Sequence, residues 1–141
     1  MMDDPYDLSL FREAQEPVIR RVLDELAEGR KQSHWMWFVF PQIAGLGRSA
    51  MAEKYALHSA AEACAYLADP ILGPRLHRCT ELVCAVEGRT AREILGVPDD
   101  MKFRSCMTLF TEAAPQEPLF RAALAKFFKG EPCPLTLEKL A

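Results

Sequence analysis

The chain has 141 residues, of which 50% are hydrophobic and 26% charged, and its formal net charge is −3. This composition indicates one globular domain and excludes a disordered chain. Binding to the nucleic-acid backbone needs a basic surface or stripe, so the negative charge argues against a nucleic-acid partner.

Helical periodicity follows a short lead-in. Residues 1–7 are acidic and are predicted to form a loose N-terminal segment. Apolar side chains then recur three or four residues apart, the spacing that predicts amphipathic helices. In the first part of the chain, the pattern predicts helical segments over residues 8–14, 17–28, 34–39 and 50–57.

The same spacing continues to the C-terminal end. It predicts helical segments over residues 60–67, 70–87, 91–95, 98–111, 117–129 and 137–140. The apolar run at residues 35–40 is the one stretch that resembles a strand, and it has no second strand with which to pair. We therefore expect an all-α fold, in which residues 1–141 form a single compact domain of about eight or nine short helices.

Capping residues and prolines mark the predicted helix starts. Ser33 and Ser49 are predicted N-caps, because a hydroxyl can accept a hydrogen bond from the first turn. Capping boxes are predicted where a serine or threonine is followed three residues later by glutamate, at Ser59–Glu62 and Thr90–Glu93. Prolines just inside a predicted start support the same helices. These prolines are Pro17, Pro70, Pro98 and Pro118.

The cysteines and the apolar runs predict the compartment. The five cysteines are an odd number, form no CxxC pair and follow no signal-peptide pattern, so we expect reduced thiols in a cytoplasmic protein. No apolar run approaches the roughly 20 residues that span a bilayer, so no membrane association is expected. The three histidines lack metal-ligand spacing, and no nucleotide-binding glycine motif is present. We therefore expect no metal and no cofactor.

The stretch His34-Trp-Met-Trp37 has two interpretations. In the first, the rings anchor the hydrophobic core, because large aromatic side chains dominate core area. In the second, Trp35 or Trp37 forms a pocket wall that stacks on a planar ligand, with His34 donating or accepting a proton. Six consecutive large apolar residues, at 35–40, cannot all face inward on one helix. This argument favours a cleft beside them.

Two further groups of polar residues could line a pocket. The turn containing Gly47, Arg48 and Ser49 leads into a helix N-terminus, where backbone N–H groups and an arginine suit a phosphate or carboxylate, although most such turns merely redirect the chain. A second group lies on the helix predicted over residues 98–111. It consists of Lys102, Arg104, Ser105 and Thr108. This group is either a solvated face or one wall of a polar pocket.

A catalytic cysteine has little support in the sequence. No cysteine lies at a predicted helix N-terminus, where a lowered thiol pKa is expected. Among the five, Cys106 is the best remaining possibility. The paired carboxylates Asp3-Asp4 and Asp99-Asp100 are expected at a loose terminus and at a helix start, where they compensate the helix dipole.

Taken together, several segments resemble a known family. They are residues 33–42, 45–49, 65–67, 70–76 and 100–110, and the set resembles the bacterial domain-of-unknown-function family 1810. The family is all-α and has no established activity, so the resemblance implies the fold and no reaction. The family pattern has serine where this chain has Cys106, so no hydroxyl role is expected there. The polar members of the matching blocks are His34, Gln42, Ser49, Lys102, Ser105 and Thr108.

Three hypotheses follow for function. In the first, a small anionic or nucleotide-like ligand binds between residues 34–49 and 100–110, and His34 is the general acid–base if the protein is an enzyme. In the second, residues 35–40 form an exposed protein-interaction surface without catalysis. In the third, the aromatic stretch is simply core. Exposure of these side chains, and a cavity joining the two segments, distinguish the three.

Overall fold

The computed structural model describes residues 6–141, in which helices are the only regular elements apart from one isolated bridge between Ile43 and Leu57. The predicted all-α fold is confirmed, with ten helices in this part of the chain where about eight or nine were expected. The helices are α1 (Ser9–Gln15), α2 (Ile19–Ala27), α3 (Met36–Val39), α4 (Ala50–Lys54), α5 (Ala60–Ala68), α6 (Leu72–Ala85), α7 (Ala91–Leu95), α8 (Asp99–Ala113), α9 (Pro118–Phe128) and α10 (Pro134–Leu140). Most of the predicted lead-in, and Asp3-Asp4 with it, lies outside the described residues.

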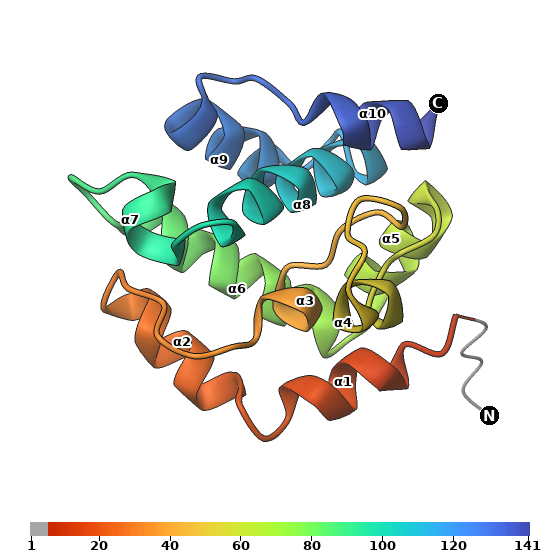
Figure 1. The fold of residues 1–141 in the computed structure, drawn as a ribbon, viewed down its shortest axis with the longest axis horizontal. Helices are drawn as coiled ribbons and strands as arrows, with labels where there is room; N and C mark the ends of the chain where they lie inside the picture. The colour runs from red at the N-terminus through yellow and green to blue at the C-terminus, as the bar shows by residue number, and fades with distance from the viewer. Residues whose placement is uncertain (1–5) are drawn as a thin grey trace.

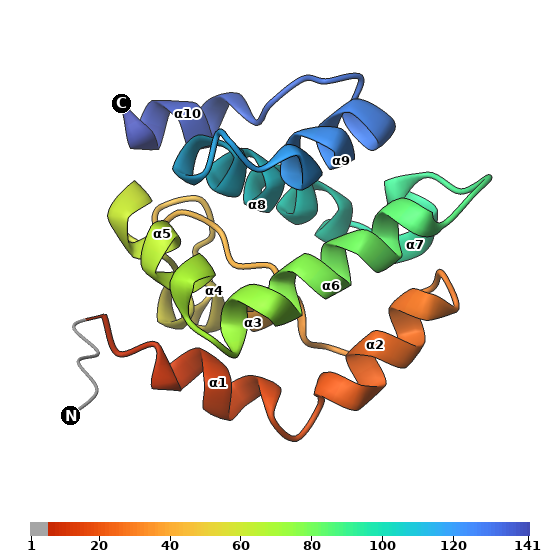
Figure 2. The same ribbon diagram turned by 180° about the vertical axis from the view of Figure 1, so that it is seen from behind.

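The helices form layers around the two longest, α6 and α8. Helices α8, α9 and α10 stack on one side of the molecule, α1 and α2 run along the opposite side, and α6 lies between them (Figures 1 and 2). Helix α8 packs against α5, α7, α9 and α10, and its residues from Ser105 to Phe110 are all buried. No helix within residues 6–141 has the length and hydrophobicity needed to cross a membrane.

The short helix α3 is enclosed by the rest of the fold. Its neighbourhood, residues 35–40, contributes five buried side chains, and only Trp37 is partly exposed. The expectation that these six residues cannot all face inward is confirmed by Trp37. The other five are buried because α3 is a single turn surrounded on several sides. The buried amide of Gln15 donates to the carbonyl oxygen of Phe38 at 2.7 Å and so joins α1 to α3.

Most predicted helix caps are present. The Ser49 hydroxyl accepts from the backbone N–H of Ala52, and Thr90 with Glu93 forms a complete capping box. Ser59 caps α5, but the Glu62 carboxylate accepts from the N–H of His58 instead of that of Ser59. That second capping box is therefore incomplete.

Other helices begin a few residues away from their predicted starts. Pro118 occupies the first turn of α9 as predicted, whereas Pro98 lies at the N-cap of α8. Pro17 and Pro70 lie in turns two residues before α2 and α6 begin. The Ser33 cap is wrong: α3 begins at Met36, and the Ser33 hydroxyl donates to Glu25. A buried carboxylate competes better for this hydroxyl than a helix start does.

Helices α5 and α6 approach each other closely at Gly73. A Cβ built at this position would lie 2.1 Å from the carbonyl oxygen of Leu67, a backbone atom that cannot move aside as a side chain can. We expect Gly73→Ala to lower the free energy of unfolding by about 2–3 kcal/mol, despite the better helix propensity of alanine.

Chemical denaturation measures this change. Arg78→Ala is the matched control, since Arg78 is an exposed residue of the same helix. Its effect should stay within about 0.5 kcal/mol. Equal stability of the two variants would show that α5 and α6 are not in close contact at Gly73.

Candidate functional site

One cavity lies where the two predicted segments meet. Its volume is about 310 Å³, and it is bounded by the loop before α3, by α3 itself and by the start of α8. The lining residues are Lys31, His34, Met36, Trp37, Val97, Pro98, Asp99 and Lys102. The cavity therefore joins an aromatic wall to several charged groups.

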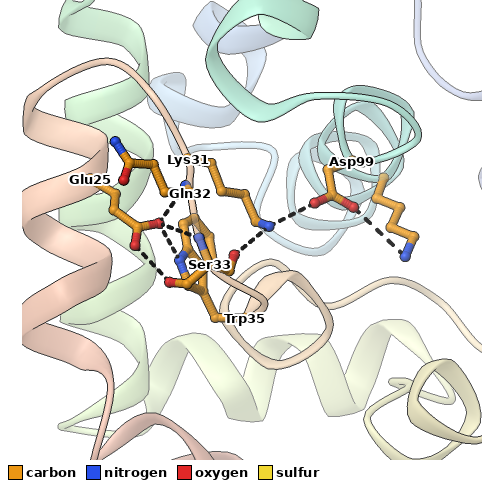
Figure 3. Close-up of polar contacts among 7 residues, drawn as sticks. Glu25, Lys31, Gln32, Ser33, Trp35 and Asp99 are labelled. Carbon is orange, nitrogen blue, oxygen red and sulfur yellow. Dashed lines mark hydrogen bonds and ion pairs between the residues drawn. The ribbon is translucent and has the colours of Figure 1, made fainter.

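The loop that carries His34 is held in place by the buried carboxylate of Glu25, on α2 (Figure 3). Its Oε1 atom accepts from the N–H groups of Gln32 and Ser33, at 2.8 and 3.0 Å, and from the Trp35 indole at 2.9 Å. Its Oε2 atom accepts from the Ser33 hydroxyl at 2.6 Å. These four hydrogen bonds to one carboxylate fix the conformation of residues 32–35.

These contacts keep Glu25 ionised. Burial opposes the charge and raises the pKa of this carboxyl group. The hydrogen bonds from the Ser33 hydroxyl, the Gln32 N–H, the Trp35 indole and the Ser33 N–H outweigh burial. The pKa of Glu25 is consequently lowered from 4.5 to about 2.

Lys31 connects the same loop to α8. Its ammonium donates to the carbonyl oxygen of Ser33 at 2.6 Å and lies 2.9 Å from the Asp99 carboxylate (Figure 3). It also lies 5.0 Å from the centre of the Trp35 ring, a cation–π distance. Because its side chain is only 8% exposed, Lys31 acts mainly as a fixed positive charge in the cavity wall.

Lys102 is more exposed than Lys31 and lies farther from Asp99. Its ammonium lies 3.8 Å from Asp99 and 5.3 Å from the centre of the Trp37 ring, and its side chain is 24% exposed. The one carboxylate, Asp99, therefore faces two lysines, and the lining has an excess of positive charge.

The structure brings together three of the predicted site residues, His34, Trp37 and Lys102. His34 is exposed and Trp37 is partly exposed, so both can meet a ligand. Trp35 is only 1% exposed, and its N–H is bonded to Glu25. The prediction that Trp35 stacks on a ligand is therefore wrong, because its ring is part of the core.

The glycine turn lies away from the cavity. Gly47, Arg48 and Ser49 line no part of it, and the Ser49 hydroxyl is used to cap α4. Gly47 is needed for packing, since a Cβ there would lie 2.4 Å from that of Ala52. Gln42 also lies outside the cavity, and its carbonyl oxygen accepts from the N–H of Leu57.

The remaining predicted residues of α8 bind another part of the chain. The Arg104 guanidinium donates to the carbonyl oxygens of Glu131 and Pro132, at 3.0 and 2.9 Å. The Thr108 hydroxyl accepts from the N–H of Cys133 at 2.9 Å, and the Ser105 hydroxyl lies 3.3 Å from its sulfur. These three side chains therefore support residues 131–133 and do not line the cavity.

Sequence reasoning missed five cavity residues, two of them charged, and one cysteine. The sequence predicts Asp99 only as compensation of a helix dipole and predicts no role for Lys31, because neither sequence position indicates that the two form an ion pair. Cys133 lies at the N-cap of α10, four residues before the start predicted for that helix at Leu137. Cys106, the cysteine favoured from sequence, is fully buried, and burial raises its pKa well above the usual value.

A second cavity, of about 360 Å³, lies between α6 and the start of α9. Its lining includes Leu67, Pro74, His77, Glu117 and Phe120. None of the predicted site residues lines it. The cavity at His34 therefore remains the better candidate.

Comparisons with known proteins identify a family without an assigned activity. The chain matches the family described as "Protein of unknown function (DUF1810)" over residues 5–140, which confirms the resemblance found in the sequence. It is similar to the conserved hypothetical protein Rv1873 from Mycobacterium tuberculosis, with a TM-score of 0.96 between the two structures. The two chains share 52% identity, over 97% of this chain and 98% of that one. No curated protein matches the chain.

The Glu25 contacts predict how stability changes with pH. Because the pKa is lower in the folded state, the stabilisation is fully present above pH 4.5 and is lost as the pH falls towards 2. A fall in pKa from 4.5 to about 2 corresponds to roughly 3 kcal/mol. We expect Glu25→Gln to lose roughly 2–3 kcal/mol at pH 7 and to flatten the pH dependence in this range.

Urea unfolding between pH 2 and pH 7 measures both effects. Asp24→Asn is the control, since Asp24 is exposed on the same helix and its charge should matter little. If Glu25→Gln behaves like this control, the carboxylate does not hold the loop.

Proposed function

The chain belongs to the DUF1810 family, a family of unknown function, and we propose that it binds a small anionic ligand carrying a planar ring in the cavity at His34. A nucleotide is the kind of ligand that this proposal describes. The observation that carries it is the convergence of His34, Trp37 and Lys102 on one cavity.

The cavity suits such a ligand in size and charge. Its volume of about 310 Å³ lies at the lower end of the range for small-molecule sites, which is about 300–1,000 Å³. Two lysines face one carboxylate, so an added anion reduces the imbalance of charge. The partly exposed Trp37 provides an apolar wall for a ring.

The three residues have separate roles in this proposal. Lys102 meets the anionic group, because its side chain is more exposed and less engaged than that of Lys31. His34, exposed at the rim, adds a hydrogen-bond donor or acceptor. If the bound molecule reacts by proton transfer, His34 is the general acid–base.

The alternative of an interaction surface at residues 35–40 has no support in the exposure of these side chains. It requires exposed aromatic side chains, and five of the six residues are no more than 7% exposed. Their area is already used inside the domain, so they cannot bind a partner without unfolding part of it.

We also propose that the protein works in the cytoplasm. All five cysteines are free thiols, and an oxidising compartment would favour disulfides. No nucleic-acid or membrane partner is part of this proposal.

Isothermal titration with adenosine monophosphate, inorganic phosphate and adenosine tests the binding proposal. We expect adenosine monophosphate to bind more tightly than adenosine, which lacks the charge. Lys102→Gln should weaken its binding about tenfold or more, because a hydrogen bond to a charged group contributes roughly 1.5–3 kcal/mol. Lys129→Gln, the control, removes an exposed lysine away from the cavity and should change nothing. Absence of binding by either anion, or equal affinity in Lys102→Gln and the wild type, would contradict the proposal.

Fluorescence provides a second and independent measurement. Trp37 lines the cavity, whereas Trp35 is buried. We expect adenosine monophosphate to quench the emission of the wild type, through stacking on Trp37, and to leave the emission of Trp37→Phe unchanged. Quenching that persists in Trp37→Phe would place the ligand elsewhere.

A further inference from the structure

We propose that Cys133 is a reactive thiol of this protein, held between the buried hydroxyls of Ser105 and Thr136 and open to modification by small electrophiles. This site is separate from the cavity at His34 and does not depend on the function proposed for it. It accounts for the polar residues of α8 that the cavity leaves unused.

The first observation is that three side chains of α8 fix the backbone around this cysteine. Arg104 holds the carbonyl oxygens of Glu131 and Pro132, and Thr108 accepts from the N–H of Cys133. The Thr108 hydroxyl in turn donates to the carbonyl oxygen of Arg104 at 2.8 Å. The backbone of Cys133 is therefore held in one place relative to α8.

The second observation concerns the Ser105 hydroxyl, which lies against the sulfur. Its oxygen is 3.1 Å from the carbonyl oxygen of Met101 and 3.3 Å from the sulfur of Cys133. A hydroxyl has one hydrogen, so it can be given to only one of these acceptors at a time. When the Cys133 thiol ionises, its negative sulfur becomes a stronger acceptor than the Met101 carbonyl oxygen. The Ser105 hydroxyl can then rotate and donate its hydrogen to the sulfur.

The third observation is an unused buried hydroxyl. Thr136 is 0% exposed, and its Oγ1 atom has no hydrogen-bond partner among the residues that the structure describes. A buried hydroxyl without a partner is costly and needs an explanation. Thr136 follows Cys133 by three residues at the start of α10, and a thiolate there is the acceptor that this hydroxyl lacks.

These contacts determine whether the pKa of the Cys133 thiol is raised or lowered. Partial burial raises the pKa of Cys133. The hydroxyls of Ser105 and Thr136, which can donate to the sulfur once it is ionised, and the N–H groups of Thr136 and Leu135 oppose burial and lower the pKa overall. Burial instead raises the pKa of Cys79 to about 12. Cys133 is also partly exposed, so an electrophile can reach it.

Cys64 is a control within the same chain. It is exposed, but its sulfur donates a hydrogen bond to the carbonyl oxygen of Ala113 at 3.1 Å, an interaction that requires the protonated thiol. Cys133 has the opposite arrangement, since the Ser105 hydroxyl lies 3.3 Å from its sulfur and can donate to the ionised thiol. The two thiols thus differ in which protonation state the surrounding protein stabilises.

Alkylation of the folded, full-length protein with limiting iodoacetamide tests the proposal. The thiolate sulfur attacks the carbon of the reagent, a sulfur–carbon bond forms, and iodide leaves with the electron pair of the broken bond. Peptide mass spectrometry between pH 5.5 and pH 9 gives a rate for each cysteine. We expect Cys133 to react about tenfold faster than Cys64 at pH 7, with a lower midpoint in its pH profile.

Variants separate the hydroxyl effect from a change in folding. Ser105→Ala and Thr136→Val should each slow the reaction of Cys133 several-fold at pH 7 and raise its midpoint, with the rate of Cys64 unchanged. Thr136→Ser, which keeps the hydroxyl, should retain the fast reaction. The proposal is overturned if Cys133 in the wild type reacts no faster than Cys64, or if neither hydroxyl variant moves the midpoint of its pH profile.

Discussion

The arrangement of the candidate site depends on one buried carboxylate. Glu25 accepts four hydrogen bonds from Gln32, Ser33 and Trp35, and these bonds determine the path of the chain between α2 and α3. That path places Trp35 in the core, His34 at the surface and Lys31 beside α8. A buried charge without partners is unstable, so the carboxylate and the loop can only be ordered together. The cavity thus depends on the hydrogen bonds that the buried Glu25 carboxylate accepts from this loop.

Helix α8 supports two different polar structures along its length. Its first turn presents Asp99 and Lys102 to the cavity, where they meet Lys31 and Trp37. Further along, Arg104, Ser105 and Thr108 bind the segment before α10. In both places a polar side chain on an otherwise buried helix fixes a neighbouring loop. Buried polar groups are stable only with partners, and these loops supply the partners.

Local rules succeeded wherever neighbouring residues decide the outcome. The capping residues Ser49, Ser59 and Thr90 were found because a cap involves atoms only three residues apart. Ser33 has the same local pattern, yet its hydroxyl binds Glu25, eight residues away. The argument that the apolar residues 35–40 cannot all face inward holds for Trp37 alone, for a similar reason. It considered one helix alone, whereas α3 is covered by other elements from several directions.

The sequence by itself determined the all-α fold, the approximate helix positions, the family, and two segments that meet at a cavity. It could do so because helical periodicity and capping are local, and because the motif residues His34, Trp37 and Lys102 are recognisable by type. Only the tertiary structure decided that Trp35 is core, that Arg104, Ser105 and Thr108 serve Cys133, and that Lys31 and Asp99 pair. Those contacts join residues from 10 to 68 positions apart. They form only when packing removes water from between the elements, which no sequence spacing records.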